Sequence, residues 1–170
     1  MPVKYKFRGD IAEMIFDDNG LKLTFPEGFS RMDEEETKKL NFTAGGEPMV
    51  FEDKNRHIII SLGINKINAI SAFILSNKDI SKITEKQMRK ANDTYGYTFG
   101  GFKECFIGGR KAEGFAYSYR VGETEMTAEV YTLKANKSIY YFYFYTRTES
   151  KAENLKLFSE LLSSAQWANS

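Results

Sequence analysis

The sequence has few of the side chains that nucleophilic and metal-dependent enzymes use at their active sites. Its 170 residues include one histidine, His57, and one cysteine, Cys105. A zinc site needs three or four thiolate or imidazole ligands, so this pair predicts no metal site. A single cysteine also excludes an intrachain disulfide, and it gives no indication of an oxidising compartment.

The chain also lacks an excess of charge of either sign. Its 24 lysines and arginines balance 23 aspartates and glutamates, for a formal net charge of +1. This balance offers no electrostatic footprint for nucleic acid or anionic lipid. Long apolar runs are missing too: residues 139–145 fall far short of the roughly 20 residues that span a bilayer. We therefore expect no nucleic-acid partner and no membrane insertion.

The first ten residues lack the apolar core of a signal peptide. Together with the single cysteine, this predicts a soluble, cytoplasmic protein. A chain whose leader had been removed would give the same sequence.

Aromatic residues are what the sequence has in excess. Ten tyrosines and fourteen phenylalanines bring the aromatic fraction to 15%, and many of them cluster in residues 114–147. Side chains alternate between the two faces of a strand, so Tyr141, Tyr143 and Tyr145 share a face opposite Tyr140, Phe142 and Phe144. A strand that is apolar on both faces should be covered on both, which predicts a central position. Turns at residues 122–123 and 135–137 would make this region a three-stranded meander.

The rest of the chain alternates hairpins with helical patterns. Asn19-Gly20 predicts a turn between strands at residues 11–16 and 21–25, because both residues tolerate positive φ. A second hairpin is expected from arms at 49–52 and 57–64, and a strand at 98–107 leads into Gly108-Gly109. Capping-box spacings predict helices at residues 33–40, 84–95 and 150–167. Residues 43–48 indicate a loop, whereas residues 67–75 fit a helix or a strand.

These elements predict one α+β domain over residues 1–170, with an antiparallel sheet of about six or seven strands between helices. Strict β-α-β alternation is lacking, which argues against a doubly wound parallel sheet.

Three patterns could carry chemistry, and each has a simpler structural explanation. A Cys105/His57 dyad would need a reactive thiolate, whereas a cysteine within an aromatic strand is typical of core packing. The glycine pairs at 100–101 and 108–109 match neither a P-loop nor a dinucleotide fingerprint, so a turn and a close backbone approach explain them better. Acidic residues at 33–36 suit the first turn of a helix. We predict no catalytic residue, no metal site and no cofactor.

The tyrosines are the one unusual feature. Tyrosine is favoured over phenylalanine where one end of the ring meets water or a polar partner. The candidate partner-binding residues are Tyr117, Tyr119, Tyr141, Tyr143 and Tyr145. The alternative is that a helix covers them, with their hydroxyl groups bonded at the edge of the layer, and a central strand favours this alternative.

Four segments resemble the PsbP-like fold superfamily, which includes PsbP and Ran-binding Mog-like proteins and many small bacterial proteins. They are residues 20–29, 106–117, 138–145 and 161–164, whereas residues 64–77 depart from the pattern. The resemblance is a loose order of hydrophobic residues, glycines and helices. It implies an antiparallel sheet between helical layers and a role in binding partners, in some members as a chaperone for apolar segments. It carries over no functional residue.

We therefore predict a non-catalytic module, an adaptor or chaperone-like protein, that binds a protein or peptide. The alternatives are a small-molecule enzyme using Cys105 and His57, and a structural building block that forms a homodimer or larger homo-oligomer.

Overall fold

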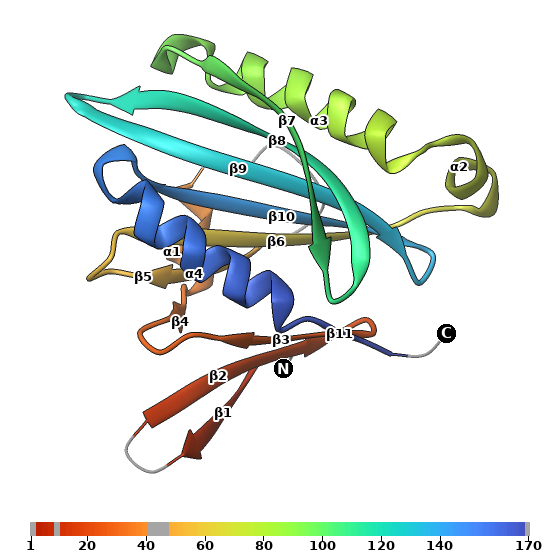
Figure 1. Cartoon of the computed structure of the whole chain (residues 1–170), viewed down its shortest axis with the longest axis horizontal. Coiled ribbons are helices and arrows are strands. Elements are labelled where there is room, and N and C mark those ends of the chain that lie inside the picture. The colour runs from red at the N-terminus through yellow and green to blue at the C-terminus, as the bar shows by residue number, and fades with distance from the viewer. Residues whose placement is uncertain (1–2, 9–10, 41–47, 169–170) are drawn as a thin grey trace.

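The computed structural model describes residues 3–8, 11–40 and 48–168, and only the backbone of residues 5–8 and 11–13. Apart from Pro48, the loop predicted at residues 43–48 lies outside these ranges. A large antiparallel sheet dominates the fold (Figure 1), in the order β4-β5-β6-β10-β9-β8-β7. Its strands are β4 (Ser30–Arg31), β5 (Met49–Asp53), β6 (Ile58–Lys66), β7 (Thr98–Ile107), β8 (Arg110–Val121), β9 (Thr124–Ala135) and β10 (Ser138–Arg147).

A second, smaller antiparallel sheet has the order β1-β2-β3-β11. Its strands are β1 (Val3–Arg8), β2 (Ile11–Asp18), β3 (Leu21–Phe25) and β11 (Gln166–Trp167). The helices within the described residues are α1 (Glu34–Lys38), α2 (Ala69–Ile74), α3 (Asn77–Ala91) and α4 (Lys151–Ser163), with 3₁₀ turns at Asp93–Tyr95 and Thr148–Ser150.

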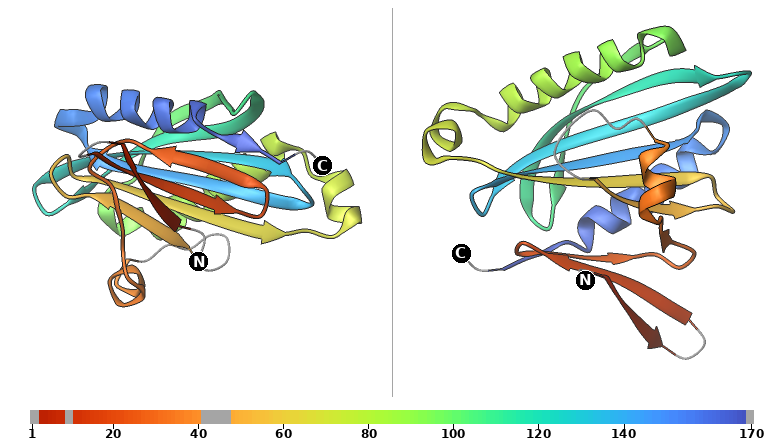
Figure 2. Two further views of the ribbon diagram at one scale, coloured as in Figure 1. Left: turned by 90° about the horizontal axis from the view of Figure 1, so that it is seen from below. Right: turned by 180° about the vertical axis from the view of Figure 1, so that it is seen from behind.

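The two faces of the large sheet are covered by different elements. α4 lies in front of the sheet in Figure 1 and behind it in the reversed view of Figure 2, so it covers one face. There the core joins α4 and the small sheet to Tyr140, Phe142 and Phe144 of β10. α3 covers part of the other face, where Met88 packs with Tyr143 and Tyr145 of the same strand. The predicted class, an antiparallel α+β sheet between helices, is confirmed.

β10 is the central strand, as the two-faced aromatic pattern predicts. β6 lies on one side of it and β9 on the other. The tyrosine on the α4 side of β10 is Tyr140, and its hydroxyl donates to the carbonyl oxygen of Asn19. That bond joins the turn of the β2–β3 hairpin to the large sheet.

The predicted turns are confirmed where local chemistry specifies them. Asn19 and Gly20 have φ of 49° and 81°, and Asn136 and Lys137 have φ of 50° and 57°. At Gly100, an added Cβ would lie 3.0 Å from the carbonyl oxygen of Ala116, which is the close backbone approach expected there.

Other boundaries differ from the prediction. The early hairpin belongs to the small sheet, whose strands β1 and β11 the sequence analysis missed. α3 begins at Asn77 and ends at Ala91, so the capping box expected at Thr84 is wrong; Thr84 is buried in the helix and donates to the Ile80 carbonyl. α4 ends at Ser163, and the Ser150 side chain makes no capping bond, which contradicts the third predicted capping box.

His57 also lies differently from the prediction. It is the last residue of the β5–β6 turn and has φ of 54°, whereas the sequence placed it at the start of the strand. Histidine is among the residues that tolerate this left-handed region best.

Candidate functional site

The five predicted tyrosines lie together on the face of the large sheet that α3 partly covers. β10 contributes three of them, stacked in a row with ring centroids 6.3 Å and 6.5 Å apart. β8 contributes the other two, and the ring of Tyr119 meets that of Tyr145 edge-on at 6.5 Å. Alternation puts the tyrosines of each strand on one face. β8 and β10 both pair with β9, in a register that makes this the same face of the sheet.

Most of this tyrosine layer is buried. Tyr117, Tyr143 and Tyr145 are buried against Met88 of α3, while Tyr119 and Tyr141 are half-buried. Burial raises the pKa of the Tyr119 hydroxyl to about 12. The five tyrosines predicted to bind a partner therefore also belong to the core between α3 and the sheet.

The part of this face that α3 leaves open is hollowed. One hollow of about 390 Å³ lies at the C-terminal end of α3, and a second of about 430 Å³ lies toward the β5–β6 turn. Both are lined by Ile59, Val121, Met126 and Tyr145, so they form one continuous depression, the sheet-end groove. Its α3 side is also lined by Lys39, Leu40, Met88, Ala91, Asn92, Tyr95, Tyr117 and Tyr119. Its turn side is lined by Glu52, Asp53, Lys54, His57, Ile58, Thr124 and Arg147.

Charged side chains are more numerous toward the β5–β6 turn, because Lys39 is charged at the α3 end and Glu52, Asp53, Lys54 and Arg147 at the other. Val121 is 54% exposed and Tyr95 is 49% exposed, so apolar surface reaches solvent at its α3 end. At the other end Lys54 lies 3.5 Å from Glu52, and Arg147 lies 3.9 Å from Glu149. Each pair has one well-exposed member, Lys54 or Glu149, so it adds little stability and its charges can pair with a ligand instead.

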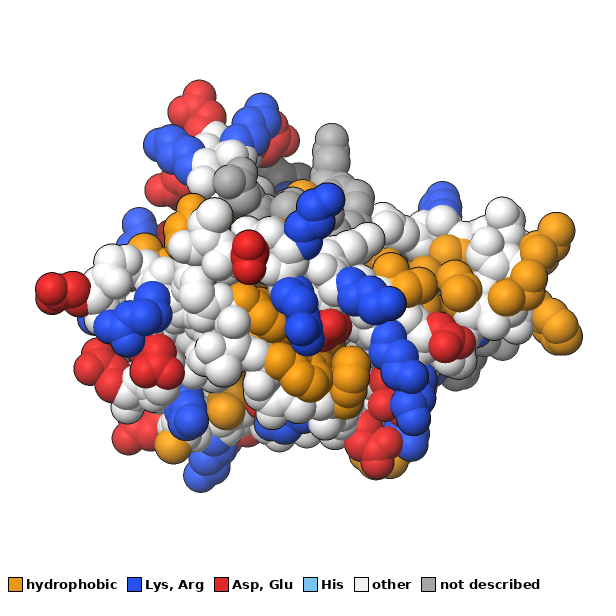
Figure 3. All heavy atoms as spheres, turned by 90° about the horizontal axis from the view of Figure 1, so that it is seen from above, with side chains coloured by type: hydrophobic (Ala, Val, Ile, Leu, Met, Phe, Trp, Pro, Cys, Tyr) orange, Lys and Arg blue, Asp and Glu red, His pale blue; other side chains and the backbone are white. Residues whose placement is uncertain are grey.

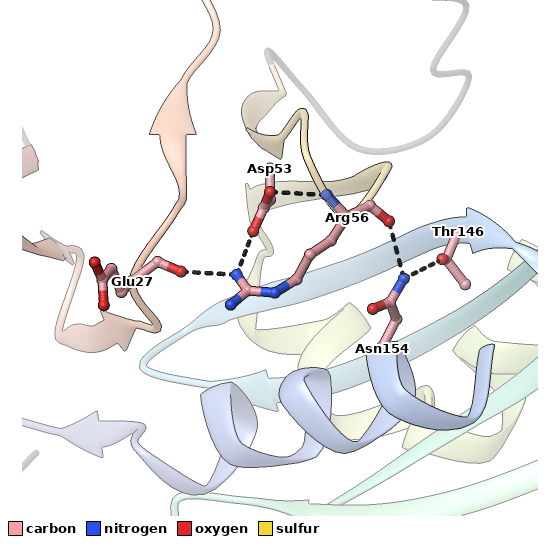
Figure 4. A network of polar contacts seen from close by, with 5 residues as sticks. All are labelled: Glu27, Asp53, Arg56, Thr146 and Asn154. Carbon is pink, nitrogen blue, oxygen red and sulfur yellow. Dashed lines mark hydrogen bonds and ion pairs between the residues drawn. The ribbon is translucent and has the colours of Figure 1, made fainter. Parts of the chain in front are cut away.

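A polar network fixes the turn that closes the charged end (Figure 4). Arg56 forms an ion pair with buried Asp53 and donates to the Glu27 carbonyl at 2.8 Å. The Asn154 amide of α4 then donates to the Arg56 carbonyl at 3.0 Å and to the Thr146 hydroxyl of β10 at 2.7 Å. Contacts with β5, with the turn after β3 and with α4 thus hold the turn that carries His57. The imidazole itself is exposed.

The structure does not bring Cys105 and His57 together. Cys105 lies on the edge strand β7, where it packs against the core on the α4 side. His57 precedes β6, and four strand steps of about 4.8 Å separate β6 from β7 along the sheet. Burial, together with the charge of Glu129, raises the pKa of the thiol to about 12, the opposite of what a nucleophilic cysteine requires.

Within residues 3–8, 11–40 and 48–168, no group of three or more His, Cys, Asp or Glu side chains could hold a metal ion. None of the helices in these ranges combines the length and the apolar character that crossing a bilayer requires.

Three of the five predicted tyrosines lie in this groove. Tyr117, Tyr119 and Tyr145 line it, whereas Tyr143 and Tyr141 continue the row away from it. Val121 had a usable signal, because it alternates onto the same face of β8 as Tyr119. Tyr95 and Ile59 had none, since their places depend on where α3 ends and on the pairing of β6 with β10.

No family model matches the chain, and no curated protein matches it in sequence. Solved structures do match. PsbP (CyanoP) of Synechocystis sp. PCC 6803 has a TM-score of 0.68 at 17% identity, covering 96% of both chains. The Ran-binding protein Mog1p of Saccharomyces cerevisiae has a TM-score of 0.56 at 9% identity, covering 97% of this chain and 96% of its own.

LpqN of Mycobacterium tuberculosis, described as involved in cell envelope biogenesis, also scores 0.56, at 11% identity over 95% of this chain and 93% of its own. At these identities the similarity concerns the fold. The PsbP-like fold that the sequence suggested is confirmed.

Proposed function

We propose that this chain, which has the PsbP/Mog1-like fold, is a non-catalytic binding module that holds an extended peptide segment of a partner protein in the sheet-end groove. The observation that carries the proposal is the stretch of aromatic sheet face beyond the end of α3 that the described residues leave uncovered. Its floor is apolar and its two ends differ in polarity, which suits a peptide bound in one direction.

The composition of the groove supports a protein partner. Tyrosine and methionine are enriched at protein interfaces, where their side chains offer a large contact area that adapts to the ligand. Tyr95 is half exposed and Tyr119 is half-buried, and Met126 lines the same hollow. A hollow of about 390 Å³ falls within the range of ligand-binding pockets.

Similar folds offer a weaker, independent argument. Mog1p is described as a Ran-binding protein, so this fold serves there to bind another protein. That the partner is a protein or peptide, and that the chain is cytoplasmic, stay predictions from the sequence.

Selection of a displayed random-peptide library against the folded protein tests the proposal. We expect the selected peptides to be rich in apolar residues. Replacing exposed Val121 with aspartate puts an unpaired charge on the groove floor, and Tyr119→Ala removes one wall. Each change should weaken peptide binding about ten-fold or more in fluorescence anisotropy.

The matched control is Ile83→Asp, which adds the same charge at an exposed apolar residue of α3 outside the groove. Circular dichroism establishes that each variant is folded. Equal binding by the wild type and by Val121→Asp would refute the groove as the site, as would an equal loss in Ile83→Asp.

A further inference from the structure

The short helix α2 has its apolar side turned to solvent. Ile70, Phe73 and Ile74, at helical positions i, i+3 and i+4, form a single stripe. In a helix of a globular protein such a stripe normally faces the core. Here the three side chains are 72%, 91% and 67% exposed, and no residue of α2 is buried.

Hydrogen bonds tie α2 and the start of α3 to the large sheet. The Lys134 ammonium group donates to the Ala72 carbonyl oxygen at 2.6 Å. Directly after α2, the Asn77 side chain accepts from the Lys134 backbone amide at 2.9 Å and donates to the Lys111 carbonyl at 3.3 Å. α2 is therefore tied to β9 through a backbone carbonyl and through the start of α3, and its apolar stripe is exposed.

Positive charge surrounds this apolar tip. Residues 67–77 contain no charged side chain, and Lys66 and Lys78 flank them directly. In Figure 3, hydrophobic side chains gather at the right-hand tip over α2, and Lys and Arg side chains lie over the adjoining α3. The exposed lysines of α3 recur every fourth residue, at Lys78, Lys82, Lys86 and Lys90.

The acidic side chains of α3 offset only part of this positive charge, because Asp79 and Glu85 stand against four lysines and Arg89. Asp79 caps the start of α3 through Ser76, and buried Glu85 pairs with Arg89 and accepts from the Tyr97 hydroxyl. Like charges at i and i+4 repel, so the row weakens the helix that carries it. An anionic surface would relieve that repulsion.

We propose that the α2 tip and the lysine row of α3 form a docking surface for an anionic membrane. The stripe of α2 enters the boundary between headgroups and acyl chains, and the lysines contact lipid phosphates. Apolar side chains on one side of a short helix with lysines behind them are the pattern of interfacial membrane binding. The net charge of the whole chain is +1, so it does not reveal this local excess of lysine.

Other occupants fit the surface less well. A second copy of the chain would place two lysine rows against each other, and three exposed side chains fall well below the roughly 800 Å² per partner of a stable interface. A protein partner would need an apolar pocket with an acidic rim. A membrane needs only the protruding apolar side chains and positive charge that this surface has.

Flotation with vesicles tests the proposal. The wild type should bind phosphatidylcholine vesicles that contain phosphatidylserine, bind pure phosphatidylcholine vesicles more weakly, and dissociate as salt is raised. Lys82→Glu/Lys86→Glu should weaken binding about ten-fold or more, because each lysine contributes about a five-fold factor at an anionic surface. Ile70→Ser/Phe73→Ser should weaken it to a similar extent by removing apolar area.

Matched controls separate these effects from general changes of charge or hydrophobicity. Lys151→Glu/Lys156→Glu makes the same charge change on exposed residues of α4, and Phe106→Ser removes a comparably exposed aromatic ring from β7. Both controls should bind like the wild type. The proposal fails if the wild type ignores anionic vesicles, leaving the tip to a protein partner, or if the controls lose as much binding as the α2 and α3 variants.

Discussion

Cys105 shows how the environment of one residue decides its chemistry. The side chain is half-buried on β7 against the core, and Glu129 lies close enough to disfavour a second negative charge. Burial and this carboxylate together outweigh the opposing effect of Lys103, which is why the pKa of the thiol rises to about 12. Since the thiolate is the reactive form, Cys105 should be inert in the folded protein.

We therefore expect native protein at pH 8 to react with iodoacetamide at least about a hundred-fold more slowly than protein in guanidinium chloride, where the thiol has its ordinary pKa of about 8.5. Mass spectrometry of the alkylated protein over time measures both rates. Rapid labelling of the native protein would contradict this and would revive the enzyme alternative.

The sequence predicted which face of a strand a side chain lies on better than it predicted which atoms surround that side chain. The face shared by Tyr117, Tyr119 and Val121 follows from alternation along a strand, which is a local property. Gly114 shows the limit: an added Cβ would lie 2.1 Å from the Val130 carbonyl oxygen on the next strand. That constraint comes from the pairing of β8 with β9, so no local pattern reveals it.

Among the elements, α3 has the best-defined start. The Ser76 hydroxyl accepts from the Asp79 amide at 3.0 Å, and the Asp79 carboxylate accepts from the Ser76 amide at 3.1 Å. This is a complete capping box with aspartate in the place where glutamate or glutamine is usual, so the sequence analysis passed over it. The hydrogen bonds to Ser76 also lower the pKa of Asp79.

The two serine caps make a matched pair for a stability measurement. Ser76→Ala should lower the free energy of unfolding by about 1 kcal/mol, because it leaves the first amides of α3 unpaired. Ser150→Ala should change it little, since Ser150 makes no side-chain capping bond. Guanidinium chloride unfolding of both variants provides the comparison. A larger loss in Ser150→Ala than in Ser76→Ala would show that the caps are assigned wrongly.

The elements that the sequence predicted well are those specified by neighbours along the chain. Asn19-Gly20, Asn136-Lys137 and Gly108-Gly109 set their turns through backbone conformation, and the strands between them follow. α2 is the contrasting case. Its apolar spacing fits a helix or a strand, and the stripe that results is exposed, because Lys134 ties the helix to the sheet through the Ala72 carbonyl. The direction in which a short helix faces is a tertiary property.

At the scale of the whole molecule, tyrosine hydroxyls are buried on both sides of the large sheet. Desolvation by burial is the main cause that raises their pKa values, and Glu85 and Glu129 add to it at Tyr97 and Tyr131. The tyrosines whose pKa is raised are Tyr97, Tyr117, Tyr119, Tyr131, Tyr141, Tyr143 and Tyr145. The fold therefore depends on keeping these groups protonated.

Because the folded chain keeps these hydroxyl groups protonated, its free energy of unfolding depends on pH. Below about pH 10 the hydroxyl groups are protonated in both the folded and the unfolded chain, so they do not affect the balance. Above that pH the unfolded chain releases protons that the folded chain retains. Each fully buried tyrosine then lowers the free energy of unfolding by up to about 1.4 kcal/mol per pH unit, until its folded pKa is reached.

We expect the protein to unfold cooperatively above pH 10, and tyrosinate absorbance near 295 nm should rise together with the loss of near-ultraviolet circular dichroism. The unfolded control in guanidinium chloride should titrate all ten tyrosines around pH 10. If most tyrosines of the native protein ionised at that pH while the circular dichroism persisted, the aromatic layer would be open to solvent. α3 would then not cover the sheet, and the sheet-end groove would extend along the whole row from Tyr145 to Tyr141.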